Sequence, residues 1–150
     1  MTETHQPALK LHAIQLRHVF VNELLLRNFA PAPDERIELD SAEFQMQVRH
    51  SDYREKSKDI LVEVSVSLGD EVYSEETSPF PFFLKVALTG RFSVDLTNFS
   101  REWLEIWAQQ NAPMILFPFV REHLYGLSSR GELPRLLFPL IQVPTLQTTE

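Results

Sequence analysis

Residues 59–68 read DILVEVSVSL, the most regular alternation of apolar and polar side chains in the chain. One parity holds Ile60, Val62, Val64, Val66 and Leu68, and the other holds Leu61, Glu63, Ser65 and Ser67. A period of two is typical of a β-strand with one buried face. Gly69 and Asp70 end this strand.

Alternation on both sides of this stretch predicts three more strands. Downstream, residues 73–81 are rich in acids and prolines and are interpreted as a crossing loop, and a strand follows over 82–95. Upstream, a first strand is expected over residues 9–16. Its apolar residues change parity after Ala13, which predicts a bulge there. The apolar run 19–26 either continues this strand or follows a bend in the chain. Residues 37–48 form a second strand with an interruption near Asp40 and Ser41.

The apolar period changes to that of a helix after residue 98. Ser100 is a suitable N-cap for a short helix. Its predicted apolar stripe is Trp103, Ile106 and Trp107. A second helix begins near Pro113, is expected to kink at Pro118 and stops at Gly131. Its stripe comprises Leu116, Phe117, Val120, Leu124 and Leu127. Four strands followed by helices predict an α+β fold, with an antiparallel four-stranded sheet and a long kinked helix on one side.

Composition limits the classes of partner. The chain has 150 residues, no cysteine, a formal charge of −7 and a pI near 5.2. Acidic charge disfavours nucleic acid and anionic membranes as partners, and no run is long enough to insert into a bilayer. The polar N-terminus lacks the pattern of a signal peptide, so we expect a cytoplasmic protein. One domain is expected over 1–150, with a flexible N-terminus over 1–8 and a short tail over 145–150.

No pattern of catalytic or metal-binding residues is evident. The five histidines include no pair at helical ligand spacing, and no nucleophile elbow or phosphate-binding glycine loop occurs. We therefore predict a protein that is not an enzyme and uses neither metal nor cofactor. A small-molecule enzyme or binding domain, using a pocket between sheet and helix, remains the alternative from another class.

Aromatic residues cluster around the loop before the fourth strand. Phe80, Phe82 and Phe83 lie at its end and Tyr73 at its start. They form either a core corner or an exposed binding surface. Because successive strand residues point to opposite faces, Phe82 and Phe83 cannot both pack beneath the helices.

Residues 111–134, NAPMILFPFVREHLYGLSSRGELP, resemble the long helix of the SecB chaperone family. They contain the family pattern P-x-I-L-F-P-[FY]-x-R-E followed by S-R-G-x-[FL]-P. The stretches 59–68 and 91–94 are similar to the family's third and fourth strands, so the resemblance extends over about 9–144.

The resemblance implies an ATP-independent holdase that binds unfolded preproteins in apolar grooves and transfers them to the SecA motor. It also implies a homotetramer built as a dimer of dimers. The expected client-binding residues are Phe44, Met46, Tyr73, Phe80, Phe82 and Phe83. The expected oligomer contacts are Trp103, Trp107, Phe117 and Val120.

Two departures from the family pattern bear on function. Residues 145–150 leave no room for the family's final helix. On the acidic SecA-docking surface, Glu23 keeps one acid, whereas Arg27 and Lys85 replace others, which argues against SecA as a partner. A dedicated chaperone of a toxin–antitoxin system, protecting its antitoxin, is the alternative within the class.

Overall fold

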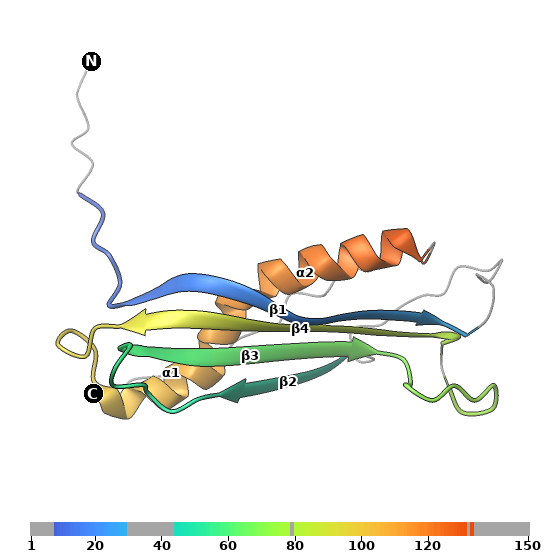
Figure 1. Cartoon of the computed structure of the whole chain (residues 1–150), viewed down its shortest axis with the longest axis horizontal. Helices are drawn as coiled ribbons and strands as arrows, with labels where there is room; N and C mark the ends of the chain where they lie inside the picture. Colours follow the sequence, from blue (N-terminus) through green and yellow to red (C-terminus); the bar gives the residue numbers. More distant parts are fainter. Residues whose placement is uncertain (1–7, 30–43, 79, 132, 134–150) are drawn as a thin grey trace, which may run out of the picture.

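The computed structural model of the chain describes residues 8–29, 44–78, 80–131 and 133. One antiparallel sheet has the spatial order β1-β4-β3-β2 (Figure 1). Its strands are β1 (Ile14–Asn28), β2 (Gln45–His50), β3 (Asp59–Leu68) and β4 (Phe82–Val94). A 3-10 turn, η2 (Arg101–Trp103), leads into α1 (Leu104–Gln110) and α2 (Ala112–Arg130). Both α-helices lie behind the sheet in Figure 1, which confirms the predicted α+β fold. We call the side of the sheet that they cover the helix side and the opposite side the open face.

The core forms between the two central strands and α2. Alternate β3 residues lie opposite β4 residues of the same side, as in the pairs Ile60–Phe92 and Val64–Leu88, and all four are buried. Gly90 lies between these positions. A Cβ atom there would come within 2.8 Å of the Leu116 side chain and of the Phe92 ring. The glycine therefore allows α2 to pack directly on β4.

Strand β1 continues through both apolar segments and adjusts its phase with two bulges. The register with β4 shifts between Leu16 and His18 and again between Val21 and Glu23. The strand begins at Ile14, not at residue 9, because β4 ends at Val94, which pairs with Ile14. The expected change in the parity of the apolar residues does occur, but at these two bulges, which lie after Ala13. They keep apolar side chains on the helix side although the sequence changes parity twice.

The loop between β3 and β4 joins neighbouring strands, so its interpretation as a crossing loop was wrong. Gly69 opens it with φ of +87°, and a Cβ atom at this residue would collide with the Phe82 carbonyl oxygen. The Phe29 N–H donates to the Pro81 carbonyl at 2.9 Å, which ties the end of the loop to β1. The chain changes sheet edges between β1 and β2 instead, since these strands lie at opposite edges.

The helical region follows the predicted order with two corrections. Ser100 makes no side-chain capping hydrogen bond. Trp103 lies in the 3-10 turn and is exposed, because the tighter turn shifts the phase and places Leu104 in the buried stripe with Trp107. Helix α2 ends at Arg130 as expected, and the Gly131 N–H donates to the Leu127 carbonyl. Its predicted stripe is confirmed, since all five residues are buried.

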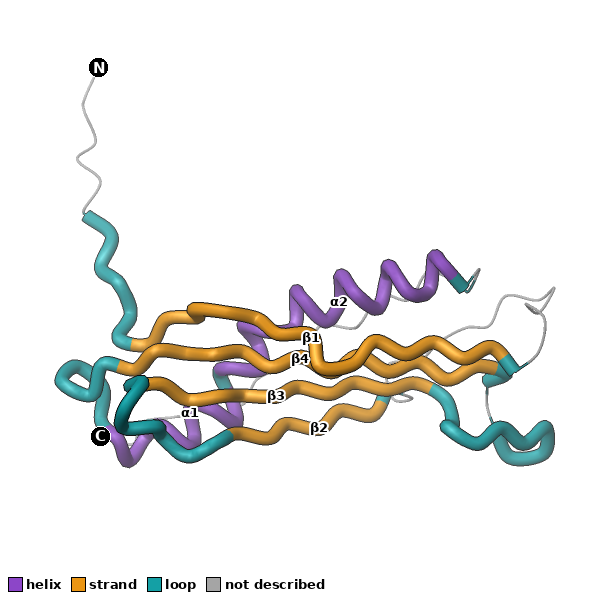
Figure 2. The backbone as a smooth tube through the Cα atoms, viewed as in Figure 1, coloured by secondary structure: helices purple, strands orange, loops and turns teal. Residues whose placement is uncertain are grey.

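The helical region also changes direction along its length (Figure 2). Asn111 separates α1 from α2, and Pro118, which has no N–H to donate, lies inside α2. Three expectations fall outside the described residues: the first part of the second strand at 37–43, the flexible N-terminus up to residue 7, and the C-terminal tail with its missing helix.

Candidate functional site

Apolar side chains remain uncovered on the helix side of both edge strands. On β1, Val21 and Leu24 lie opposite the buried Leu88 and Val86, yet they are 48% and 38% exposed. On β2, Met46 lies opposite the buried Val66 and is also exposed. Helix α2 covers the central strands and leaves these two strips open, which we call the edge strips (Val21 and Leu24; Met46). Uncovered apolar residues of this kind mark binding surfaces when they lie together.

The outer surface of α2 is also apolar. Ile115, Phe119 and Tyr125 are exposed, while the core stripe faces the sheet. These three residues were not among the expected site residues. The spacing of Ile115 and Phe119 at i and i+4 was the available signal, because it defines a second apolar stripe on the same helix.

Strand β1 offers a long free edge beside one of these strips. Among the described strands it pairs only with β4, and it is 15 residues long, whereas the opposite edge strand, β2, has 6 residues. Unpaired N–H and C=O groups along an edge strand can pair with an extended segment of another chain. Backbone pairing of this kind places little constraint on the sequence of the partner.

The expected client-binding residues occupy different environments. Phe80 and Phe82 are buried in the core, with ring centroids 5.4 Å apart. Phe83 points to the open face, as expected from its parity, and is also buried. Tyr73 is half-buried and stacks on Phe29 with ring centroids 5.3 Å apart and planes 7° apart.

Phe44, half-buried, and the exposed Met46 lie at the opposite edge of the sheet. The six expected residues therefore do not form one surface within a single protomer. Phe44, Met46 and Tyr73 are the three with substantial contact to solvent.

The expected oligomer contacts separate in the same way. Trp103 is 48% exposed and free to contact another molecule. Trp107, Phe117 and Val120 are buried within the protomer, and the Trp107 ring meets Phe92 edge-on at 5.0 Å. In this protomer the second group belongs to the core, and α2 presents Ile115 and Phe119 outward instead.

The residues expected to alter SecA docking all lie on the open face. Glu23 lies opposite Ala87, and its carboxylate pairs with the Lys85 ammonium at 3.3 Å. Arg27 lies opposite Phe83 and forms no ion pair with any residue that the structure describes. The surviving acid is therefore partly neutralised by the lysine next to it, and the arginine adds positive charge to the same face.

A buried carboxylate organises the opposite end of the sheet. Asp59, at the start of β3, accepts hydrogen bonds from Arg54 Nε at 2.6 Å and Nη2 at 2.8 Å, and from Ser57 Oγ at 2.8 Å. Arg91 Nη1 approaches it at 3.3 Å. The Arg54 hydrogen bond, above all, holds the pKa of Asp59 below its ordinary range despite its burial. This arrangement secures the 51–58 turn to β3 and β4.

The described residues contain neither a metal-binding cluster nor a membrane-spanning helix. No group of three His, Asp or Glu side chains among them could hold a metal ion. No helix in the described part of the chain is long and apolar enough to cross a membrane.

Comparison with known families identifies the architecture. The family model described as "Preprotein translocase subunit SecB" matches residues 5–148. The chain belongs to the SecB family. The search of curated proteins gave no match. Among solved structures, the chain is similar to a Mycobacterium tuberculosis SecB-like chaperone in complex with a ChAD peptide from the HigA1 antitoxin.

That alignment has a TM-score of 0.60 and 18% identity, and covers 89% of this chain and 94% of the other. At this identity it establishes a shared fold, so the SecB-type sheet and helix are confirmed. A protein of unknown function from Streptococcus agalactiae aligns with a TM-score of 0.40 and 14% identity over 85% of this chain and 97% of that one, a score too low to argue from.

Proposed function

We propose that this SecB-family protein is an ATP-independent holdase that binds unfolded polypeptides in the cytoplasm and keeps them from aggregating. The observation that carries the proposal is the match to the SecB family model over residues 5–148. The uncovered edge strips support it, because unfolded chains expose apolar side chains that such strips can bury. Binding of this kind needs neither cofactor nor nucleotide.

The helix side is the proposed client-binding side. Val21 and Leu24 offer apolar contacts at one edge, and Phe44 and Met46 at the other. Tyr73 and Phe29 form a stacked aromatic pair just beyond the end of β1. Phe80 and Phe82, which are buried in the core, are proposed to support this surface from beneath. Phe83, on the open face, is not part of the proposed surface.

Matched substitutions on each edge strand test the proposal. Val21→Lys places a charge on the helix side, and Phe20→Lys places the same charge on the open face one residue away, at similar exposure. On β2, Met46→Lys and Gln47→Lys form the corresponding pair. We expect the helix-side variant of each pair to suppress aggregation of a chemically denatured protein less well, without nucleotide, and the open-face variant to act like the unmodified chain.

The assay is light scattering of the denatured protein after dilution into buffer, with the mass of each variant measured in parallel. If the unmodified chain fails to suppress aggregation at equimolar concentration, the holdase proposal is wrong. Equal losses in the two members of each pair would refute the helix-side assignment alone. A helix-side variant that keeps its mass but loses holding ability separates client binding from assembly.

Homo-oligomerisation is proposed through the outer surface of α2, Trp103 and the edge of β1. Ile115, Phe119 and Trp103 are exposed on one protomer, and a second copy would cover them without any change in fold. A dimer of dimers uses two different surfaces, and the helix surface and the strand edge provide two.

A dedicated role in a toxin–antitoxin system is the second candidate. The specific observation is the fold shared with a chaperone whose structure contains an antitoxin peptide. Such a role requires the client-binding side but no docking of SecA. A toxin–antitoxin gene pair beside the gene, and loss of the antitoxin when the chaperone gene is deleted, would support it, whereas a stable antitoxin in the deletion strain would contradict it.

A further inference from the structure

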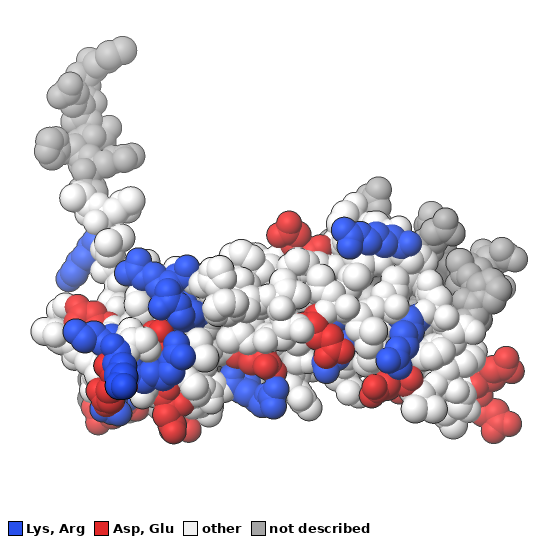
Figure 3. Space-filling view, in the orientation of Figure 1, with Lys and Arg blue, Asp and Glu red and all other residues white. Residues whose placement is uncertain are grey.

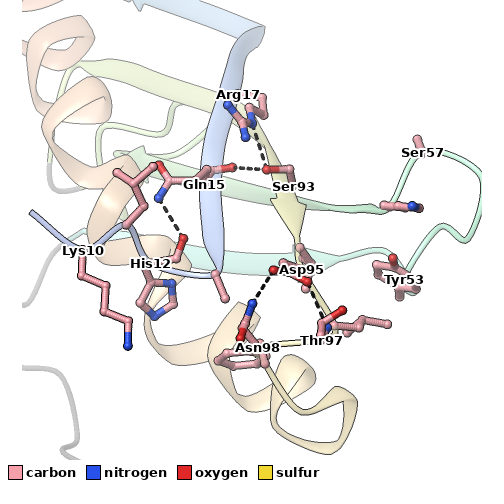
Figure 4. Close-up of a pocket in the computed structure, with 16 residues that line it drawn as sticks. Lys10, His12, Gln15, Arg17, Tyr53, Ser57, Ser93, Asp95, Thr97 and Asn98 are labelled. Carbon is pink, nitrogen blue, oxygen red and sulfur yellow. Dashed lines mark hydrogen bonds between the residues drawn. The ribbon is translucent and has the colours of Figure 1, made fainter.

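A hollow of about 1040 Å³ opens at the end of the sheet where β1 begins and β4 ends (Figure 4). Three segments far apart in the sequence form its walls: residues 10–17, the turn at 53–58, and the end of β4 with the turn at 93–99. It is separate from the edge strips, which lie farther along the sheet on the helix side. The proposed holdase function does not involve it.

Positive charge dominates this hollow. Lys10, Arg17 and Lys58 line it against a single carboxylate, Asp95. None of the three cations forms an ion pair with a described residue. Lys and Arg side chains also gather at this end of the molecule in Figure 3. In a chain with a formal charge of −7, such a concentration of unpaired cations is unexpected. We call this site the basic hollow (Lys10, Arg17, Lys58).

The carboxylate in the hollow forms hydrogen bonds within its own turn. Asp95 accepts a hydrogen bond from Asn98 Nδ2 at 2.7 Å and another from the Thr97 N–H at 3.0 Å. The Arg17 side chain is held in place by one hydrogen bond, in which its Nε donates to Ser93 Oγ at 2.9 Å. The other N–H groups of its guanidinium can therefore donate to a ligand. The hollow therefore presents positioned donors, and its one acid is already engaged by hydrogen bonds.

We propose that the basic hollow binds an acidic segment of another polypeptide, rich in Asp and Glu. Carboxylates complement the three cations, and the volume exceeds that of a typical small-molecule pocket, which favours several residues of a chain. The aromatic rings of Tyr53 and Phe99 supply apolar contact between charges. A nucleic acid fits less well, because the net negative charge of the whole protein repels an extended polyanion.

The test uses the full chain and a fluorescent ten-residue peptide of alternating Glu and Ala, beside the same peptide with Gln in place of Glu. Fluorescence anisotropy is recorded at low and at physiological salt. We expect the Glu peptide to bind and the Gln peptide not to bind. Affinity should fall as salt rises, since exposed charges are screened over about 8 Å at physiological ionic strength.

Charge-reversal variants place the site. Lys58→Glu and Arg17→Glu should each weaken binding of the Glu peptide by about five-fold, the upper range for an exposed ion pair. Arg27→Glu is the matched control: it makes the same change in net charge near the opposite end of β1 and should bind the peptide as the unmodified chain does. Thermal unfolding shows whether each variant remains folded.

Four results would overturn the proposal. The first two are no binding of the Glu peptide and equal binding of the Gln peptide. The third is an equal loss of peptide affinity in Arg27→Glu and in the hollow variants. The fourth is tighter binding of a single-stranded oligonucleotide than of the peptide. If either hollow variant unfolds, Lys58→Gln and Arg17→Gln replace it with a smaller expected loss, and unchanged affinity in both would again contradict the site. Because the assay uses no unfolded client, its failure leaves the holdase proposal unaffected.

Discussion

Strands β3 and β1 have similar apolar patterns but opposite surroundings. The apolar residues of β3 are covered by α2 and flanked by strands on both sides, and its helix-side residues are completely buried. Strand β1 has one neighbour in the described part of the sheet, and its Val21 and Leu24 stay exposed on the same side. The difference shows that apolar alternation predicts which way a side chain points and does not predict whether anything covers it. The uncovered positions on β1 are the ones that we propose for binding.

The largest expected difference between the covered central strands, β3 and β4, and the exposed edge strand β1 is in stability. Phe92→Ala should lower the free energy of unfolding by about 3–5 kcal/mol, because the ring is fully buried and packs against Trp107. Phe20→Ala on β1 should cost under about 1 kcal/mol, because its ring is 44% exposed. Urea titration monitored by circular dichroism measures both. Similar losses in the two variants would mean that β1 is covered in solution, for instance by a second copy.

A smaller effect is expected at the charged end of β3. Asp59→Asn should cost about 1.5–3 kcal/mol, nearer the lower value because Arg54 and Arg91 are partly exposed. The lowered pKa of Asp59 means that the unfolded chain binds this proton more tightly than the folded one. Its stabilisation is therefore complete above the ordinary pKa of about 3.9 and is lost as the pH falls through the lowered value.

Urea titrations between pH 7 and pH 2 test this dependence. The unmodified chain should lose stability in acid, and Asp59→Asn should lose less over the same range. Some acid sensitivity should remain in the variant, since hydrogen bonds from Asn98 and Thr97 also lower the pKa of Asp95. Parallel pH curves for the two proteins would show that Asp59 contributes nothing to the acid response.

On the outer surface of α2 the expected effect is on assembly and not on folding. Phe119→Ser should reduce the mass in solution, because it removes an apolar contact between copies, and should change the unfolding free energy of one protomer by under about 1 kcal/mol. Light scattering at micromolar concentration gives the mass, and Phe20→Ser serves as an exposed aromatic control on the open face. A monomeric unmodified chain, or equal masses in all three proteins, would refute the proposed interface.

The smallest effect is expected on the open face. Arg27→Glu with Lys85→Glu should raise the affinity for SecA several-fold and leave client holding unchanged. Lys85→Glu restores an acid beside Glu23, and Arg27→Glu restores one four residues farther along β1 on the same face. Titration at two salt concentrations should show the gain mainly at low salt. Tight binding by the unmodified chain with no gain in the double variant would return the protein to the ordinary export pathway.

Much of the architecture could be predicted from local patterns. The alternation at 59–68 and 82–95, the change to helical period after residue 98, and the stop at Gly131 place β3, β4 and α2 correctly. The opposite orientations of Phe82 and Phe83 also follow from strand geometry alone. These features depend on backbone hydrogen bonding and side-chain period, which are local properties of the chain.

The candidate site could not be predicted in the same way. Four residues expected to contact clients or other copies are buried: Phe80, Phe82, Trp107 and Phe117. Val21 and Phe119, which were not among the expected site residues, are exposed. The period of apolar residues in a segment indicates which way each side chain points. Whether that side chain is exposed depends on the path of α2 across the sheet and on the strand order β1-β4-β3-β2, which brings together residues distant in the chain. The basic hollow shows the same limit, since Lys10, Lys58 and Asp95 meet only because β1, β3 and β4 share one end of the sheet.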